Sequence, residues 1–466
     1  MADRRVVITG LGAVTGLGLG AAAMWDGLLA GRSGVGPLTR VSPEAFPCGV
    51  GAEVRDFSAK DHVPKGYRKA VKVMARDTEL AVAAARLAVA DAGLTTRSHN
   101  ESDAPDFATT YPQPRLGCQI GAGLIAAETL ELTQALATAR TGGAAVPGRI
   151  TPDGFDMQAW GAAEGGGGGM NNLQPLWMLK YLPNMLACHV TIIHGAEGPS
   201  NTITCGEVSG LLSLGESLRV IQRGAADLCF SGGAESKINL MGMLRQTLAG
   251  RLADTRAAGG VAGASVAPSA SPFDPESLGT VPGEAGAIVI VEELAGAKAR
   301  NANIYGEVVG FGAAQSTPTL PGQPRADAGK ANDGLALAIR AALTDAGIGP
   351  DEIDAIVPQG LGVPELDKPE AAALREVFGA RLASVPLVLL TPSLGDCWAG
   401  YGGVQVVAAA MMVRSQMVPA RLEAGKPAAG LLAAAAPATP ARLGHVLACS
   451  SSLGGQNAAV IVRKME

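Results

Sequence analysis

Short runs of β-branched and other apolar residues alternate along this chain with longer Ala- and Leu-rich stretches at helical spacing. The short runs predict buried strands and the longer stretches predict helices that cover them, which is typical of a layered α/β fold. The predicted helices are Thr78–Ala92, Leu335–Ala346 and one that follows Gly206 and ends near Arg223. The predicted strands are Val6–Thr9, Leu116–Gly121, Thr202–Cys205, Asp227–Ser231, Ala287–Glu293, Ile304–Gly310, Ile353–Pro358, Leu387–Leu390, Val446–Cys449 and Ala458–Val462.

The alternation is interrupted once by a turn-rich stretch of small residues, Ala257–Ser271, and then resumes. Two comparable halves therefore follow one another, and we place them at residues 1–262 and 263–466. Two stretches within the first half, near 95–114 and 141–172, are polar or rich in glycine. Such stretches add conformational freedom without packing, so both are predicted to be surface insertions.

Composition and charge narrow the class of protein. The 466 residues include 37 Lys and Arg against 42 Asp and Glu, and 47% of the residues are hydrophobic. This balance excludes general disorder and a basic nucleic-acid-binding protein. No apolar run is long enough for a membrane span, and the first strand breaks at Gly10 before a signal peptide could develop. We therefore expect a cytoplasmic protein.

Cofactor and metal signals are weak. The seven cysteines are scattered and never form a C-x-x-C pair, so neither a disulfide framework nor a zinc site is implied. The segment Gly10–Gly16 follows the first strand but lacks the third glycine of a dinucleotide-binding loop at its spacing. No cofactor is expected.

The most informative local pattern is Asn201–Gly210, a strand that ends at Gly206 and is followed by a buried helix. The apolar positions at helical spacing are Val208, Leu211, Leu212, Leu214, Leu218 and Ile221. The first helical residue lies where free backbone N–H groups and the positive end of the helix dipole converge, which suits an anion or an activated nucleophile. Glu207 occupies this place. It is either a functional group or only a complement to the helix start, and the local pattern leaves both open.

Several segments spread over nearly the whole chain resemble the β-ketoacyl-acyl-carrier-protein synthases. They are Arg4–Gly12, Trp25–Gly34, Ala196–Ser200, Gly232–Glu235, Ser271–Asp274, Gly283–Gly286 and Gly454–Asn457. The resemblance implies a thiolase-like fold, in which two similar halves stack into a five-layered α-β-α-β-α core that dimerises. It also implies decarboxylative condensation of acyl chains, carried out by a cysteine at the start of a buried helix and by two histidines.

The positions that would carry this chemistry are all replaced. The family's cysteine precedes a Ser-Gly step, which corresponds to Ser209 and Gly210 in this chain. This alignment puts Glu207 at the position of the cysteine. The segments that match the two histidine motifs place Gln359 and Asp396 at the histidines, and Thr391 at a lysine of the second motif. A carboxylate cannot carry the acyl group as a thioester, and an ionised Asp396 would repel the enolate.

Four further site positions also depart from the family. Leu361 and Val363 stand at two threonines that family members use near the pantetheine arm of the carrier, and neither side chain can donate a hydrogen bond. Ser451 and Leu453 replace the two aromatic residues of a glycine-rich gate before the last strand. The resemblance therefore implies altered carrier binding and altered gating.

Within the family, one subgroup has lost the cysteine: the chain-length factors, or β-subunits, of type II polyketide synthases. They pair with an active ketosynthase and shape the acyl tunnel. Ala249–Leu252, Val363–Asp367 and Glu370–Gly379 are similar to this subgroup, although Glu207 stands where it usually has Gln. We therefore expect a catalytically degenerate subunit of fatty-acid or polyketide biosynthesis, with an active ketosynthase or a second copy as partner, and an acyl carrier protein as a further partner.

Two other functions stay open. The chain could be an enzyme in its own right, with Glu207 or Asp396 acting on an acyl thioester as a decarboxylase, hydrolase or acyltransferase, or a homodimeric acyl-binding protein without chemistry. Cys205 and Cys397 lie beside these positions and are predicted to be inert packing residues. No histidine of this chain falls in a motif position, so no general base is predicted among them.

Overall fold

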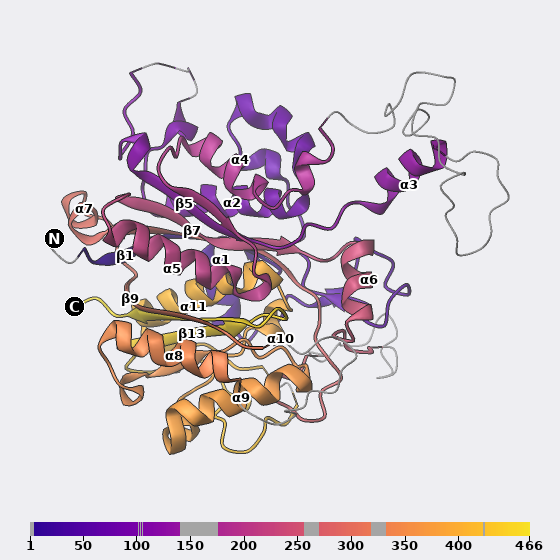
Figure 1. Ribbon diagram of the computed structural model, residues 1–466, viewed down its shortest axis with the longest axis vertical. Helices are drawn as coiled ribbons and strands as arrows, with labels where there is room; N and C mark the ends of the chain where they lie inside the picture. Colours follow the sequence, from indigo (N-terminus) through magenta and orange to yellow (C-terminus); the bar gives the residue numbers. More distant parts are fainter. Residues whose placement is uncertain are drawn as a thin grey trace.

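The computed structural model describes residues 4–100, 102, 104, 106–139, 176–255, 270–317, 332–422 and 425–466. Their helices and strands stack into five layers in the order helix, sheet, helix, sheet, helix (Figure 1). The thiolase-like fold class is therefore confirmed. The predicted insertion at 141–172 lies outside the described residues, as does most of the turn-rich stretch Ala257–Ser271.

The sheets form two groups of strands that meet in the middle. The first group runs in the order β1 (Val6–Thr15), β8 (Glu284–Glu293), β7 (Leu228–Ser236), β5 (Leu116–Ala122) and β6 (Ser200–Ile203). The second runs in the order β9 (Gly306–Gln315), β14 (Gln456–Arg463), β13 (His445–Ser451) and β10 (Ala355–Val357). A short antiparallel pairing of β1 with β9 joins the two groups into one path. The division at residue 262 assigns β8 to the second half, but β8 pairs with β1 and β7 in the first group.

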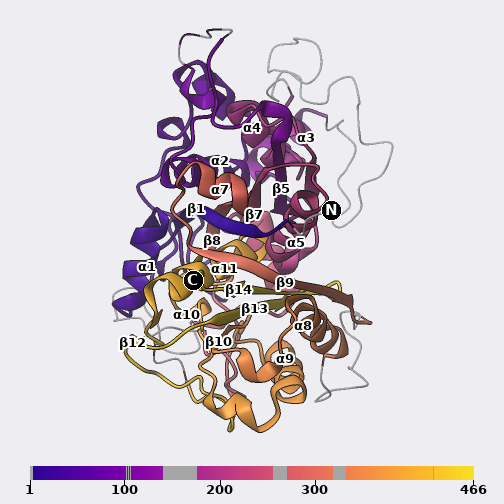
Figure 2. The same ribbon diagram turned by 90° about the vertical axis from the view of Figure 1, so that its left-hand side faces the viewer.

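Helices cover both outer faces and fill the space between the sheets (Figure 2). The outer helices are α2 (Arg76–Asp91) and α4 (Met185–His194) on the first group, and α8 (Asp333–Ala346) and α9 (Pro364–Phe378) on the second. The central helices are α5 (Ser209–Gln222) and α11 (Tyr401–Ser415), whose residues are mostly buried. The shorter elements are α1 (Ala21–Leu29), β2 (Gly18–Leu19), β3 (Gly36–Pro37), β4 (Val50–Gly51), α3 (Thr129–Thr138), α6 (Leu240–Leu248), α7 (Leu294–Ala299), α10 (Thr391–Leu394), β11 (Met417–Val418) and β12 (Thr439–Pro440).

The same glycine contact packs an outer helix in each half. A Cβ added to Gly12 in β1 would lie 1.9 Å from the carbonyl oxygen of Ala84 in α2, and one added to Gly312 in β9 would lie 2.0 Å from that of Ala338 in α8. Glycine is needed at both places because the helix backbone lies directly on the strand. Gly12 is thus a packing residue inside a strand rather than part of a loop.

One predicted strand is wrong. In Leu387–Leu390, Leu387 makes only an isolated bridge to Ile356, and the chain then turns into the short helix α10. Leu390 already has helical dihedral angles, and Pro392 occupies the first turn, where its missing N–H is not needed. Four apolar residues therefore form a buried connection instead of a strand.

None of the helices in the described part of the chain has the length and hydropathy of a membrane span.

Candidate functional site

The site is built where the two central helices begin. α5 and α11 touch through glycine: a Cβ on Gly210 would lie 2.6 Å from the backbone nitrogen of Gly403. This contact lets the two helices approach closely at their N-terminal ends. Glu207 lies in the single turn just before α5, and Asp396 lies in the connection that leads into α11. Two carboxyl groups from distant parts of the chain are thereby brought into the same buried space.

Arg251 joins these two carboxyl groups. Its Nη1 lies 2.5 Å from Oε1 of Glu207, and its Nη2 lies 3.1 Å from Oδ2 of Asp396. All three side chains are buried, with 1% of Glu207, 2% of Arg251 and none of Asp396 exposed. Arg251 follows α6 after a turn at Gly250, whose φ of +66° is in the left-handed region. We call Glu207, Arg251 and Asp396 the ion triad.

Trp398 covers the ion triad. The guanidinium carbon of Arg251 lies 4.4 Å from the centre of the indole ring, a cation–π distance. The backbone of Trp398 has a φ of +50°, a strained conformation for a bulky residue. It is held there because its N–H donates to Oδ1 of Asp396 over 3.1 Å, and the next residue, Ala399, donates its N–H to Glu235 over 2.9 Å.

The charges of the ion triad act on each other. Burial raises the pKa of Asp396 to about 6; the Arg251 guanidinium opposes this rise, and the Glu207 carboxylate adds to it. Burial lowers the pKa of Arg251, but the two carboxyl groups overcome this effect, and the net pKa is raised. Arg251 is therefore a fixed cation, and it is the group that makes two buried acids tolerable side by side.

Gln359 lies next to the ion triad but has different partners. Its side-chain Oε1 accepts the N–H of Ser451 over 3.1 Å. Its backbone oxygen accepts the hydroxyl of Tyr401 over 2.7 Å and that of Thr391 over 3.3 Å. Its Nε2 is buried without a partner among the described residues. The structure thus brings Gln359, Thr391 and Ser451 together, and the amide that stands at a predicted histidine position binds the loop after β13.

Two buried acids hold the loop that carries Leu361 and Val363, both of which are buried. The carboxylate of Asp367 accepts the backbone N–H groups of Leu361 and Gly362 over 3.0 and 2.9 Å. The carboxyl group of Glu370 accepts those of Gln359 and Gly360 over 2.8 and 2.9 Å. Burial raises the pKa of Asp367 to about 6 and that of Glu370 to about 8.

A cavity of about 500 Å³ has Trp398 in its wall. Leu453 lines it together with Gly206, which precedes Glu207. The predicted site residues therefore divide into three neighbouring places: the ion triad, the loop around Gln359, and the cavity wall.

Most of the sequence matches the two domains of a known protein family. Residues 3–297 match the family description "Beta-ketoacyl synthase, N-terminal domain", and residues 305–424 match "Beta-ketoacyl synthase, C-terminal domain". The chain belongs to the β-ketoacyl synthase family. The chain is 31% identical over 416 residues to a Streptomyces coelicolor protein named as beta-ketoacyl synthase 2 of the actinorhodin polyketide. The match covers 89% of this chain and 86% of that protein.

The chain is also similar to a second polyketide synthase protein and to a solved structure. The chain is 29% identical over 463 residues to the tetracenomycin polyketide synthase ketoacyl synthase beta subunit of Streptomyces glaucescens, covering 98% of both proteins. It is 26% identical to a chain of the solved structure titled the ishigamide ketosynthase/chain length factor, with a TM-score of 0.77 and full coverage of both chains. The resemblance identified in the sequence is confirmed.

Sequence reasoning missed the residue at the centre of this β-ketoacyl synthase site. Arg251 was noted only as part of the segment Ala249–Leu252, without a role. A buried cation was nevertheless required, because two adjacent acids at Glu207 and Asp396 need compensation. The neighbouring cysteines agree with a packing role, since burial raises the pKa of Cys205 and raises that of Cys397 well above its usual value. Among the described residues, no group of three or more His, Cys, Asp or Glu side chains could hold a metal ion.

Proposed function

We propose that this chain is a non-condensing ketosynthase-like subunit of the chain-length-factor type, which pairs with an active ketosynthase and helps to shape the acyl tunnel. One observation carries the proposal: the ion triad occupies the place where the family's cysteine and second histidine are expected. Arg251 binds both replacing carboxyl groups at 2.5 and 3.1 Å, so the centre is a closed set of ion pairs rather than an open nucleophile site.

The ion triad also argues against the rival hypothesis of an independent enzyme. A general base must reach the proton that it removes, and one oxygen of Glu207 is already bound to Arg251. Asp396 is fully buried and bound both to Arg251 and to the N–H of Trp398. The remaining Glu207 oxygen, Oε2, has no partner among the described residues and is the one atom on which the enzyme hypothesis can rest.

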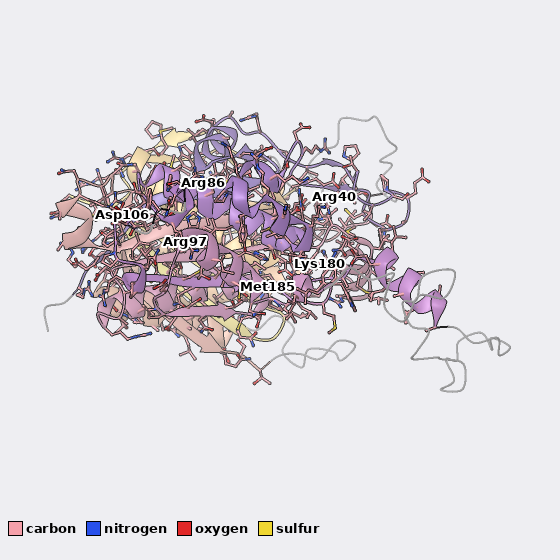
Figure 3. All side chains as sticks on the ribbon, turned by 90° about the horizontal axis from the view of Figure 1, so that it is seen from above. Arg40, Arg86, Arg97, Asp106, Lys180 and Met185 are labelled. Atoms are coloured by element: carbon pink, nitrogen blue, oxygen red, sulfur yellow. The ribbon has the colours of Figure 1, made fainter. Side chains whose placement is uncertain are left out.

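An exposed apolar surface supports pairing with another subunit. The elements that carry many of its residues, α3 and α6, lie on the same side of the molecule (Figure 1). Lys180, labelled in Figure 3, ties the segment before α4 to Glu131 of α3 with an ion pair of 2.5 Å. We define the apolar rim as Leu124, Leu130, Leu136, Leu176, Met178, Leu182, Ile192, Leu240, Leu244 and Leu248, all of which are exposed. A set of this size suggests a partner.

The edge of the first group of strands also supports pairing. β6 ends the strand order, and Ser200 and Asn201 within it are exposed. Its outer backbone groups make no ladder with another described strand, so they are free to pair with a second subunit. The Streptomyces glaucescens relative carries the name of a beta subunit, and the solved structure at 26% identity has both a ketosynthase and a chain length factor in its title. These names support the same proposal.

The direct test is a condensation assay followed by intact-protein mass spectrometry. The isolated chain is incubated with acyl and malonyl groups on an acyl carrier protein. We expect no covalent acyl adduct and no elongated product above a blank, because no thiolate stands at position 207. An adduct or a product would overturn the proposal.

A second test separates the structural from the enzymatic role of Glu207. In a complex with an active ketosynthase, Glu207→Gln keeps the shape of the side chain and one acceptor oxygen for Arg251. We expect the activity of the complex to stay within a few-fold of the wild type. A loss of more than about a hundredfold is the size expected for removal of a general base, and it would favour the enzyme hypothesis.

A further inference from the structure

Three carboxyl groups meet where β7 ends, but only two of them are bound to a cation. Glu284 in β8 binds the guanidinium of Arg76 through two contacts, of 2.7 and 3.2 Å. Glu235 in β7 forms an ion pair with Lys237. Asp77, in the first turn of α2, is the third acid, and none of the ion pairs in the described part of the chain includes it.

Asp77 is buried without a compensating cation. It is 2% exposed, and its Oδ1 accepts the N–H of Ser236 over 3.2 Å, whereas its Oδ2 has no hydrogen-bond partner among the described residues. An ionised carboxyl group in such a place is costly, and a protonated one is tolerated. Burial raises the pKa of Asp77 to about 7; the Lys237 cation opposes this rise, and the charge of Glu235 adds to it. Asp77 therefore exchanges its proton close to neutral pH.

Other charged groups face this cluster from α2, from the segment before β4, from β8 and from the connection into α11. They are Arg76, Glu79, Arg40, Glu284 and Asp396. Burial raises the pKa of Glu284, but its contacts with Arg76 overcome this effect, and the net pKa is lowered. Glu284 therefore stays ionised, and the Arg76 cation stays with it. The pKa of Asp396, about 6, is below that of Asp77, so Asp396 changes state at lower pH.

Lys237 connects this buried cluster to the surface. Its Nζ has three N–H donors; it is ion-paired with Glu235 and donates to the backbone oxygen of Leu124 over 2.8 Å. Lys237 is 6% exposed, so its ammonium group depends on these partners. Leu124, by contrast, is 65% exposed and belongs to the apolar rim. One buried ammonium group therefore fixes a carbonyl group of the surface segment that follows β5.

We propose that Asp77 is a pH-sensitive switch, which sets how firmly Lys237 holds the backbone at Leu124. While Asp77 is protonated, Lys237 binds both Glu235 and the Leu124 oxygen. When Asp77 loses its proton, a second carboxylate attracts the same ammonium group, so Lys237 shifts toward Asp77 and its bond to Leu124 weakens. The apolar rim is then fixed at Leu124 below about pH 7 and loosened above it. The switch operates in the unpaired chain, and only its effect on pairing rests on the proposed function.

The sequence allows the Leu124 carbonyl group to be observed directly. Leu124 and Ile125 form the only Leu-Ile step in the chain. The full chain, deuterated and labelled with ¹³C at leucine carbonyls and ¹⁵N at isoleucines, therefore gives one carbonyl–nitrogen correlation peak in its NMR spectrum. We expect the ¹³C frequency of this peak to follow a single transition centred near pH 7. The ¹³C resonance of the Asp77 carboxyl group, identified by its loss in Asp77→Asn, should titrate with the same midpoint.

Three variants separate the switch from general effects of pH. In Asp77→Asn the amide stays neutral and keeps an acceptor oxygen for the N–H of Ser236, so the Leu124 peak should keep its low-pH position throughout the titration. Lys237→Met removes the ammonium group, and the peak should then show no transition near pH 7. Asp91→Asn is the matched control: it removes the acid at the opposite end of α2 and should leave the transition unchanged. Thermal melting at pH 6 is the folding control for each variant.

The proposal fails if the wild-type Leu124 peak shows no transition between about pH 6 and 8, a result that needs no variant. It also fails if the transition persists in a folded Asp77→Asn protein. A midpoint more than about one pH unit from that of the Asp77 carboxyl group would assign the transition to another residue and overturn the proposal. Because the measurement uses the isolated chain, a failure to pair with a ketosynthase would contradict the proposed function and leave the switch standing.

Discussion

At Arg251, a single side chain balances two buried acids, and this makes the residue more important for stability than for chemistry. A buried ion pair contributes little compared with a well-packed apolar replacement, but removing one partner leaves an uncompensated charge. We expect Arg251→Met to lower the free energy of unfolding by about 3–5 kcal/mol, as measured by urea denaturation followed by circular dichroism.

The matched control removes all three charges together. The triple variant with Glu207→Gln, Arg251→Met and Asp396→Asn should regain most of the stability lost by Arg251→Met alone, because no charge is left unpaired. A loss below about 1 kcal/mol in Arg251→Met would mean that water or another group compensates the carboxylates, contrary to the buried geometry.

Glu370 makes stability depend on pH. Burial raises its pKa from an ordinary value of 4.5 to about 8, so between these two pH values the folded protein holds a proton that the unfolded chain has lost. The contribution of this residue to stability is complete below pH 4.5 and is lost as the pH rises through 8. The expected slope is up to about 1.4 kcal/mol per pH unit.

Glu370→Gln is the comparison for this slope. The amide does not ionise, so the difference in stability between wild type and variant should shrink steadily as the pH rises from 5 to 8. The variant starts lower, because an amide has one acceptor oxygen for the two backbone N–H groups that the carboxyl binds. Parallel stability curves for the two proteins over this pH range would show that Glu370 titrates normally.

How far the site could be predicted depends on the residue. Glu207 is singled out by the local strand, turn and helix pattern, whereas Gln359 and Asp396 are singled out only by the resemblance to the family's two histidine motifs. Arg251 has no such frame, and only the three-dimensional approach of α6 to both carboxyl groups reveals its role. Trp398 was missed for the same reason: its importance comes from a left-handed backbone conformation and from the ring that it lays over Arg251.

At the scale of elements, α6 presents a leucine stripe to solvent. Leu240, Leu244 and Leu248 recur every four residues, and all are exposed, whereas Met243 and Gln246 of the same helix are buried. A helix with apolar residues on both faces is expected to pack on both sides. The stripe belongs to the apolar rim and is the part most easily altered without touching the core.

We expect Leu244→Glu to abolish copurification of this chain with a ketosynthase partner and to leave its circular dichroism spectrum and thermal melting nearly unchanged. The charge would be buried without a partner in an interface, but it would be solvated in the free chain. Leu337→Glu is the control, since Leu337 is an exposed leucine, 55% accessible, on α8 at the far outer layer. Copurification that survives Leu244→Glu would place the interface elsewhere.

Elements were easier to predict than their ends. The alternation of apolar runs located the strands that became β1, β5, β7, β8 and β9, although β1 extends to Thr15 and β9 to Gln315, beyond the predicted ends. Glycines inside these strands looked like stops, but they allow close helix packing instead. The strand predicted for Leu387–Leu390 is wrong because burial alone does not distinguish a strand from a buried connection.

At the scale of the whole molecule, the exposed edge at β6 and the apolar rim predict a dimer. We expect a heterodimer with an active ketosynthase, or otherwise a homodimer, with an interface that buries on the order of 2,000 Å² or more. Such a complex should persist at low micromolar concentration. Co-expression followed by light scattering and native mass spectrometry distinguishes heterodimer, homodimer and monomer, and a stable monomer that never captures a ketosynthase would refute the pairing.

The ion triad is divided unequally between the two family segments. Glu207 and Arg251 both come from the stretch that matches the N-terminal domain, whereas Asp396 comes from the stretch that matches the C-terminal domain. If the protein were cut between them and made as two fragments, the first would retain a neutral pair, while the second would carry a carboxyl group with no cation beside it. In the separated fragment Asp396 would be solvated and would ionise at its ordinary pKa of 3.8, whereas burial in the whole protein raises that pKa to about 6. Reassembly between about pH 4 and 6 should therefore take up a proton, and a pH indicator would detect the reunion of the two fragments.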